Sequence, residues 1–95
     1  MAGEIAMKRY VVRYEGRVQG VGFRFNAVRQ SAGLNLNGFV RNESDGSVLM
    51  DVEGREAALK HLLRRIEEEM NDHIEAVEVT EGSLLGTLGG FHIKH

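Results

Sequence analysis

The alternation of apolar and polar residues from Lys8 to Glu15 predicts a strand, because side chains at a period of two share one face of a sheet. The apolar face of this strand carries Tyr10, Val12 and Tyr14. After a glycine-rich interval, residues 23–32 have the spacing of a short helix. Its apolar stripe consists of Ala27, Val28 and Ala32. Gly33 is then expected to end the helix, since glycine accepts the left-handed conformation that commonly follows one.

The middle of the chain predicts a hairpin of two strands. Residues 36–43 and residues 47–53 both have strand character, and Asp45-Gly46 lies between them. This dipeptide is a strong hairpin signal, because both central residues of a type I′ turn need a positive φ. Gly54 is expected to break the second of these strands.

The clearest helix in the sequence is predicted from Arg55 to Asn71. Its apolar residues recur at the i, i+4, i+7 and i+11 positions of one helical face. These residues are Leu59, Leu63, Ile66 and Met70. The run Glu67-Glu68-Glu69 is interpreted as the solvated face of the same helix rather than a metal site.

The last part of the chain predicts two further strands and completes the expected fold. Residues 74–81 have the pattern of a strand, residues 82–90 that of a loop, and residues 90–94 that of a short strand. Their apolar anchors are Ala76 and Val77 in the first strand and Phe91 and Ile93 in the second. The resulting order, βαββαβ with a small extra strand, is the ferredoxin-like split βαβ arrangement. We therefore expect an α+β domain in which two helices cover one face of an antiparallel sheet.

Length and composition narrow the class of protein. Ninety-five residues make one domain, with residues 1–7 expected as a flexible N-terminal tail and residues 8–95 as the domain. The chain has no secretory signal and no apolar run long enough to span a membrane. Because cysteine is absent, no disulfide, thiolate nucleophile or cysteine-bound metal is possible, and we expect a cytoplasmic location. The net charge of -2 gives no general attraction to nucleic acid or membrane, so neither is expected as a partner.

The glycine-rich interval is the strongest candidate for chemistry, and it reads Gly16-Arg17-Val18-Gln19-Gly20-Val21-Gly22-Phe23-Arg24. Glycine lets backbone N–H groups approach a ligand closely, and a helix N-terminus adds unpaired N–H donors. Arg24 adds a planar guanidinium suited to phosphate or carboxylate. The candidate anion ligands are Gln19, Gly20, Val21, Gly22, Phe23 and Arg24. The same pattern is also compatible with a tight turn followed by an exposed arginine.

The glycine-rich interval lacks two common nucleotide-binding motifs. A Walker A loop ends in Gly-Lys-Ser/Thr, and Phe23-Arg24 stands there instead. Phe25 occupies the place where a dinucleotide fingerprint needs its third glycine. We therefore expect a cradle for one small tetrahedral anion and not a nucleotide site.

A second block of residues follows the glycine-rich interval. It reads Gly38-Phe39-Val40-Arg41-Asn42 and is followed by Asp45-Gly46-Ser47-Val48. Together the two blocks resemble the two signatures of the acylphosphatase family. The first resembles the family's phosphate loop with its arginine, and the second resembles the strand that ends in its catalytic asparagine. The resemblance runs from about Lys8 to Lys94 and implies the same ferredoxin-like fold.

The resemblance implies hydrolysis of the carboxyl–phosphate bond of small acyl phosphates, giving a carboxylate and inorganic phosphate. Arg24 is then the catalytic residue that binds phosphate, and Asn42 orients the attacking water, since an amide both donates and accepts hydrogen bonds. The resemblance implies that no metal or cofactor is needed. It also implies that no separate base is needed, because the substrate phosphate accepts the proton of the water. We expect phosphate or sulfate to bind at the loop, and the chain to be a monomer. From the residues alone, Asn42 also suits a turn.

Three other interpretations stay open at this point. An RNA-binding module has the same order of elements, and Gly22-Phe23-Arg24-Phe25 faintly resembles its glycine–aromatic motif. That motif belongs on the third strand, however, where residues 47–53 have no aromatic side chain. A non-catalytic relative that binds an anion is the second alternative. In the third, the domain is part of a larger carbamoyl-transfer protein of hydrogenase maturation, although the length of this chain favours a free-standing enzyme.

Overall fold

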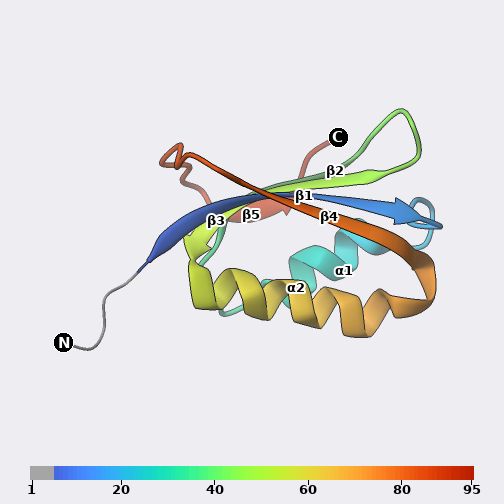
Figure 1. Cartoon of the computed structure of the whole chain (residues 1–95), viewed down its shortest axis with the longest axis horizontal. Helices are drawn as coiled ribbons and strands as arrows, with labels where there is room; N and C mark the ends of the chain where they lie inside the picture. Colours follow the sequence, from blue (N-terminus) through green and yellow to red (C-terminus); the bar gives the residue numbers. More distant parts are fainter. Residues whose placement is uncertain (1–5) are drawn as a thin grey trace.

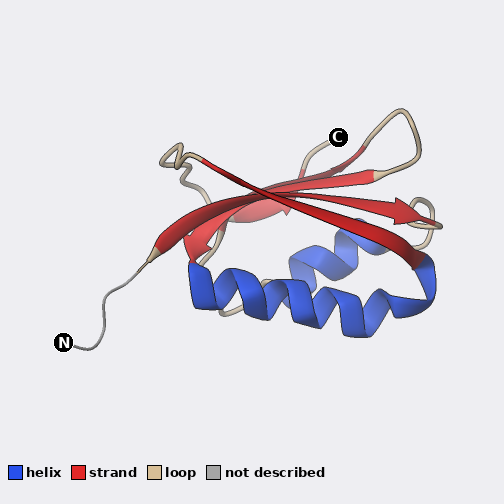
Figure 2. Ribbon diagram, viewed as in Figure 1, coloured by secondary structure: helices blue, strands red, loops and turns tan. Residues whose placement is uncertain are grey.

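The computed structural model describes residues 6–95 and contains a five-stranded sheet with two helices. In chain order the elements are β1 (Met7–Gly16), α1 (Phe23–Gln30), β2 (Asn37–Asn42), β3 (Val48–Arg55), α2 (Glu56–Met70), a 3₁₀ turn (Asn71–His73), β4 (Ile74–Gly82) and β5 (Phe91–Ile93). The strand order is β4-β1-β3-β2-β5. Figures 1 and 2 show both helices on the same side of this sheet. No helix within residues 6–95 is long and apolar enough to cross a membrane.

The sheet is mixed, which corrects the expectation of a purely antiparallel one. β5 pairs in parallel with β2, from Gly38 opposite Phe91 to Val40 opposite Ile93, whereas the other three pairings are antiparallel. The chain reverses direction in residues 83–90, between β4 at one edge and β5 at the other. β5 therefore runs opposite to β4 and in the same direction as β2. The sequence indicated a last strand, but the choice of β2 as its partner depends on the tertiary structure.

β1 begins at Met7, one residue earlier than predicted, where it pairs with Arg55. The N–H of Glu56 donates to the carbonyl of Ala6 at 2.9 Å, which holds the start of β1 against the start of α2. The remainder of the predicted tail, residues 1–5, lies outside the described residues. The division of the chain into a tail and a domain therefore stays a prediction.

The core lies between the sheet and the two helices. In β1 the buried residues alternate with half-buried ones, as the period of two predicted, and β3 alternates in the same way until Val52, after which Glu53 and Gly54 are also buried. On α2 the buried residues are Leu59, Leu62, Ile66 and Met70. Leu62 was missed by the predicted stripe, and Leu63 is only half-buried. The face of α2 that meets the sheet is therefore centred nearer Leu62 than Leu63, which the helical period alone does not determine.

The ends of α1 and the face of β4 depart from two details of the prediction. α1 ends at Gln30, and Ser31 caps it by donating from Oγ to the carbonyl of Val28 at 2.6 Å. Ala32 follows the helix and is exposed, so it does not belong to an apolar stripe. In β4, Ala76 lies opposite Glu15 and is exposed, because the register turns it away from the helices. Of the two residues predicted as apolar anchors of this strand, only Val77 is half-buried.

Gly54 does not break β3 but lies inside it, and the strand continues to Arg55. The side chain of Leu36 occupies the space into which a β-carbon on Gly54 would project. Glycine therefore allows Leu36, which precedes β2, to pack closely against β3, and it does not act as a strand terminator.

The turn between β2 and β3 is not of type I′. Gly46 has a positive φ of 95°, but Asp45 does not have the positive φ that a type I′ turn requires at both central residues. The N–H of Gly46 donates to the carbonyl of Glu43 at 3.1 Å, and the N–H of Glu43 donates to the carbonyl of Ser47 at 2.9 Å. Hydrogen bonds from Ser47 and from Arg13 to the Asp45 carboxylate lower its pKa to about 2. Hydrogen bonds to the Asp45 side chain thus stabilise a five-residue turn, residues 43–47.

A buried carboxylate organises the loop between β4 and β5. Glu53 on β3 is 5% exposed. It accepts hydrogen bonds from the backbone N–H groups of Leu85 at 3.1 Å, Gly86 at 3.0 Å and Thr87 at 3.4 Å, and from the Thr87 hydroxyl at 2.7 Å. Burial by itself raises the pKa of Glu53, but these hydrogen bonds outweigh it and lower the pKa below its ordinary value of 4.5. The ionised form is therefore favoured in the folded protein.

Replacing Glu53 with glutamine should lower the free energy of unfolding at pH 7 by about 1–3 kcal/mol, because charge-assisted hydrogen bonds to the loop are lost. Since the folded pKa lies below the ordinary value, the carboxylate stabilises the protein above pH 4.5 and loses this effect as the pH falls through the folded pKa. The difference between wild type and variant should therefore shrink in acid. Urea unfolding at pH 7 and pH 3 measures it. The exposed Glu78→Gln is the control, and an equal loss in both variants would contradict the prediction.

Candidate active site

The glycine-rich loop joins the end of β1 to the start of α1. Gly20 and Gly22 have φ values of 78° and 79°, which favour glycine, and a side chain at either position would meet nothing within 4 Å. Glycine is needed at these two positions for the path of the backbone and not for packing. Val18, between them and β1, is 1% exposed and anchors the loop to the core.

Gln19 fastens the loop to the β2–β3 turn. Its side-chain Nε2 donates to the carbonyl of Glu43 at 2.7 Å and to the carbonyl of Ser47 at 2.9 Å. Figure 1 shows the loop after β1 and the β2–β3 turn at the same end of the sheet. The amide of Gln19 therefore positions the loop, and what Gln19 can offer an anion is its backbone N–H.

A run of backbone N–H groups in the loop has no acceptor among the described residues. In the part of the chain that the structure describes, residues 18–25 donate no backbone hydrogen bond, and the first N–H used within α1 is that of Asn26, to the carbonyl of Gly22 at 2.9 Å. No acidic side chain lies in the first turn of α1. The positive end of the helix dipole and these free donors make the loop suited to bind an anion.

Arg24 lies in the first turn of α1 and has a half-buried side chain. Within residues 6–95 it takes part in no hydrogen bond and no ion pair, whereas the other half-buried arginines all have an acceptor. Those paired arginines are Arg9, Arg13, Arg41 and Arg65. Partial burial of an unpaired guanidinium is unfavourable, so the arrangement favours binding of an anion from solution.

Asn42 ends β2 on the side of the sheet that faces the helices. The register places Val48 between Tyr14 and Asn42, so the three side chains share one face. The Tyr14 ring contacts that of Phe23, the residue before Arg24, with centroids 4.8 Å apart. This row therefore leads from Asn42 to the start of α1. The Oδ1 of Asn42 is buried and has no hydrogen-bond partner among the described residues, which leaves it free to accept from a water or ligand.

Arg41, the neighbour of Asn42, lies on the opposite face of the sheet. Its Nε donates to the Glu43 carboxylate at 2.7 Å, and its guanidinium lies 5.3 Å from the centre of the Phe39 ring. This agrees with the expectation that Arg41 is a surface residue of the strand and not a second phosphate ligand. The alternation along β2 thus separates the two polar side chains.

Two buried polar groups near the site were not singled out from the sequence. The Oδ1 of Asn26 and the hydroxyl of Tyr14 are both buried without a partner in residues 6–95. Burial raises the pKa of Tyr14 above its ordinary value, so its hydroxyl stays protonated at neutral pH. The sequence could have indicated that Asn26 is buried, because Asn26 directly precedes Ala27 on the buried side of a short helix.

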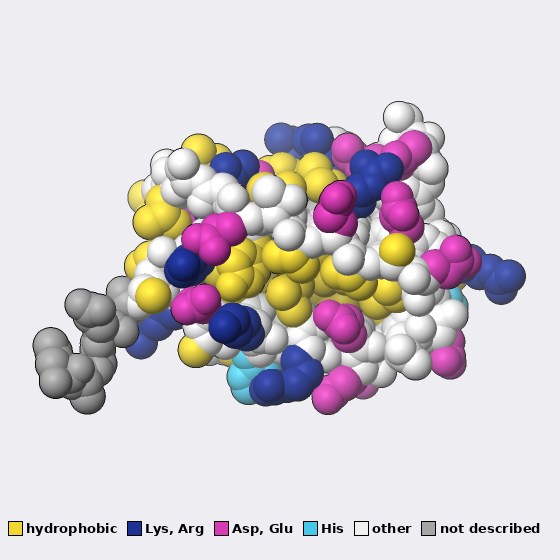
Figure 3. Space-filling view, viewed as in Figure 1, with side chains coloured by type: hydrophobic (Ala, Val, Ile, Leu, Met, Phe, Trp, Pro, Cys, Tyr) yellow, Lys and Arg dark blue, Asp and Glu magenta, His cyan; other side chains and the backbone are white. Residues whose placement is uncertain are grey.

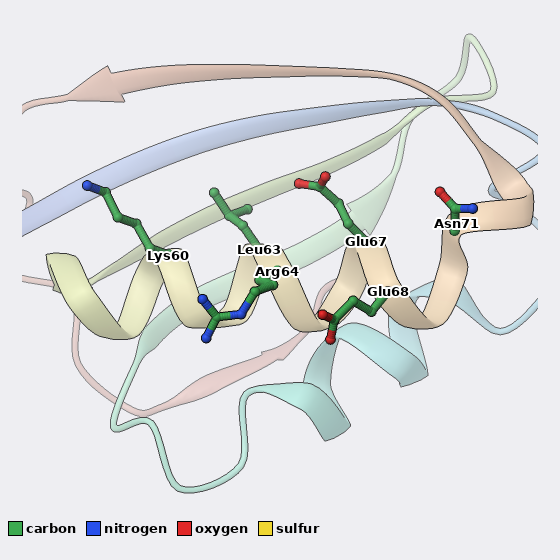
Figure 4. Close-up of a pocket in the computed structure, with 6 residues that line it drawn as sticks. All are labelled: Lys60, Leu63, Arg64, Glu67, Glu68 and Asn71. Carbon is green, nitrogen blue, oxygen red and sulfur yellow. The ribbon is translucent and has the colours of Figure 1, made fainter.

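A separate hollow runs along α2, away from the glycine loop. Figure 3 shows apolar side chains exposed in a hollow on the face where β4 and α2 lie. A pocket of about 570 Å³ on α2 is lined by Lys60, Leu63, Arg64, Glu67, Glu68 and Asn71. In Figure 4, Lys60, Leu63 and Glu67 project from the side of the helix that faces the sheet. The charges that line the pocket are of both signs, so the pocket does not match a single anion. Residues 67–69 are exposed, as expected for the solvated face of the helix.

Comparison with known proteins gives the relationship directly. Residues 10–93 match the family model described as Acylphosphatase. The chain belongs to the acylphosphatase family. It is 40% identical over 88 residues to an acylphosphatase of Salinibacter ruber, covering 92% of this chain and 93% of that protein. An acylphosphatase of Thermus thermophilus is likewise 40% identical over 88 residues, covering 92% of this chain and 99% of that protein.

Solved structures of the acylphosphatase family agree with the fold. The crystal structure of the acylphosphatase from Bacillus subtilis matches with a TM-score of 0.81 and 31% sequence identity, covering 95% of this chain and 100% of that chain. The family predicted from the two sequence blocks is therefore confirmed. The predicted α+β fold with two helices is confirmed as acylphosphatase-like, with a five-stranded sheet that is mixed and not antiparallel. The roles of individual residues remain predictions.

Proposed function

We propose that this protein hydrolyses small acyl phosphates at the carboxyl–phosphate bond, with the glycine loop, Arg24 and Asn42 as its active site. One observation carries the proposal: among residues 6–95 the half-buried guanidinium of Arg24 has no partner, and it stands beside a run of backbone N–H groups that find no acceptor there. Membership of the acylphosphatase family supports the same reaction. A non-catalytic anion-binding protein would not need Asn42 to carry a free, buried oxygen at this end of the sheet.

In the proposed mechanism the loop holds the phosphoryl group. Backbone N–H groups of residues 19–24 donate to its oxygens, and Arg24 binds two of them through its planar fork. These donors are fixed by the fold, with Gln19 tied to Glu43 and Ser47, so they need little rearrangement as negative charge develops. Inorganic phosphate and sulfate carry the same tetrahedral group and should bind at the same place.

Asn42 orients the nucleophile in this proposal. Its free Oδ1 accepts a hydrogen bond from a water, whose oxygen forms a bond to phosphorus as the bond from phosphorus to the acyl oxygen breaks. The bonding electrons leave with the carboxylate, and the proton of the water passes to a phosphate oxygen. No side chain has to act as a general base in this scheme.

The proposal extends to the setting of the reaction. We place the enzyme in the cytoplasm because the chain lacks cysteine, and we propose no nucleic-acid partner because its net charge is only -2. We also propose that it acts as a monomer. In the ferredoxin-like split βαβ topology, with both helices on one face, the sheet surface that an RNA-binding domain would use is the helix-free one. On β3 that surface carries Leu49, Asp51 and Glu53. None of the three is aromatic, and both acids are already used, since Asp51 pairs with Arg9 and the buried Glu53 binds the loop between β4 and β5. This surface of β3 therefore offers no ring on which a base could stack.

We expect hydrolysis to proceed without added metal or cofactor. Wild-type protein incubated with excess EDTA should hydrolyse benzoyl phosphate at the same rate, within twofold, as untreated protein. Phenyl phosphate, a monoester without the reactive acyl bond, is the control and should not be turned over. Loss of activity in EDTA that a divalent ion restores would overturn the metal-free mechanism, and equal hydrolysis of the monoester would overturn the substrate class.

A further inference from the structure

We infer that an apolar groove beside the glycine loop binds the acyl part of the substrate and favours an aromatic ring. This inference rests on the proposed hydrolysis of acyl phosphates. The groove has a volume of about 810 Å³ and lies between α1, the end of α2 and β5. This volume falls within the usual range for small-molecule sites. The residues that carry the argument are Val21, Phe25, Val28, Phe91 and Ile93.

The groove is continuous with the proposed phosphate site. Val21 and Gly22 line the groove and are also members of the glycine loop. In an acyl phosphate a single oxygen joins the carbonyl carbon to phosphorus. With the phosphoryl group seated on the loop, the acyl group must therefore lie within a few bonds of Val21, where the groove begins.

The side chains of the groove suit a neutral, flat group. Phe25 projects from α1 and is 75% exposed, although it stands two residues from the buried Phe23. Phe91 on β5 adds a second, half-buried aromatic ring. Arg29 and Glu69 contribute one charge of each sign, so the groove offers no net attraction to a charged acyl group. Two aromatic side chains provide edge and face contacts for a third ring.

The test compares benzoyl phosphate with acetyl phosphate, which differ in the size of the acyl group. Phe25→Ala should lower kcat/KM for benzoyl phosphate by about fivefold to tenfold, chiefly through KM, because part of the ring loses its apolar contact. For acetyl phosphate the change should stay below twofold. Phe25→Tyr keeps the ring and should behave like wild type. Leu85→Ala is the matched control, since Leu85 is 64% exposed and does not line the groove.

Equal losses on both substrates, or no loss on either, would overturn the groove assignment. Binding of phenylphosphonate and methylphosphonate, followed by thermal shift, provides a readout that does not need turnover. Tighter binding of phenylphosphonate, lost in Phe25→Ala, supports the groove, and equal binding of the two overturns it. If wild type hydrolysed neither acyl phosphate, the proposed function would be wrong, while the phosphonate pair would still decide whether the groove takes a ring.

Discussion

Replacing Arg24 with alanine is expected to abolish phosphate binding at the loop and to lower kcat/KM for an acyl phosphate by about 10²-fold or more. In wild type, phosphate at a hundred times its dissociation constant should stabilise the folded state by about 2.7 kcal/mol, because it binds only the folded protein. The variant should show no such stabilisation. Thermal unfolding with and without phosphate, together with steady-state kinetics, measures both effects.

Two further variants test whether the shape of the guanidinium matters at Arg24. Arg24→Lys keeps the charge but should remain poor in binding and turnover, since an ammonium cannot make the planar, two-pronged contact. Arg41→Ala is the matched control: Arg41 pairs with Glu43 on the other face of the sheet and should leave the phosphate shift unchanged. An equal phosphate shift in wild type and Arg24→Ala would place the anion elsewhere.

The variant Asn42→Ala should lower kcat by about 10²-fold or more while phosphate affinity changes little, by analogy with the loss of one preorganised polar group. The reason is that Asn42 is proposed to act on the water, whereas the loop and Arg24 hold the phosphoryl group. Asn42→Asp should also be impaired, because a carboxylate would repel the bound anion. The measurements are kcat, phosphate affinity and the unfolding midpoint of each variant.

Asn37 provides a control on the same strand for the role of Asn42. Its Oδ1 accepts a hydrogen bond from the N–H of Gly90 at 2.8 Å, at the end of β2 away from the site. Asn37→Ala should therefore lower stability by about 1 kcal/mol and leave kcat close to wild type. If Asn42→Ala behaved in the same way, with lower stability and normal turnover, Asn42 would have a structural role and no part in the mechanism.

The kinds of elements, and most of their positions, were predictable from the sequence because they depend on local patterns. The period of two in β1 and the helical period in α2 appear in the structure with ends that differ by one residue from those expected. Gly33 does have a left-handed φ of 80°, but it does not end α1 as predicted, because the helix already ends at Gln30 and is capped by Ser31. The two sequence blocks likewise identified the family, because spacing along the chain carries that information.

Features that depend on distant contacts were not predictable in this way. Gly54 stays inside β3 because Leu36 packs against it, and β5 joins β2 in parallel because the preceding loop crosses to the far edge. The turn at Asp45 is stabilised by its own contacts with Ser47 and Arg13 and not by the type I′ geometry. Each outcome is decided by which partner is available in space, and local spacing does not contain that information.

The candidate site also has features that the sequence determines and features that depend on the tertiary structure. The sequence by itself determined which residue types are available: glycines that allow the loop, a guanidinium at Arg24 and an amide at Asn42. The tertiary structure decided which polar groups are already used, since the amide of Gln19 is bound to the β2–β3 turn while Arg24 and the Oδ1 of Asn42 have no partner in residues 6–95. It also brought Phe25 and Phe91, far apart in the chain, to one groove. Whether a polar group is free to bind a ligand depends on its neighbours in the folded chain. Those neighbours are determined only when the helices pack on the sheet.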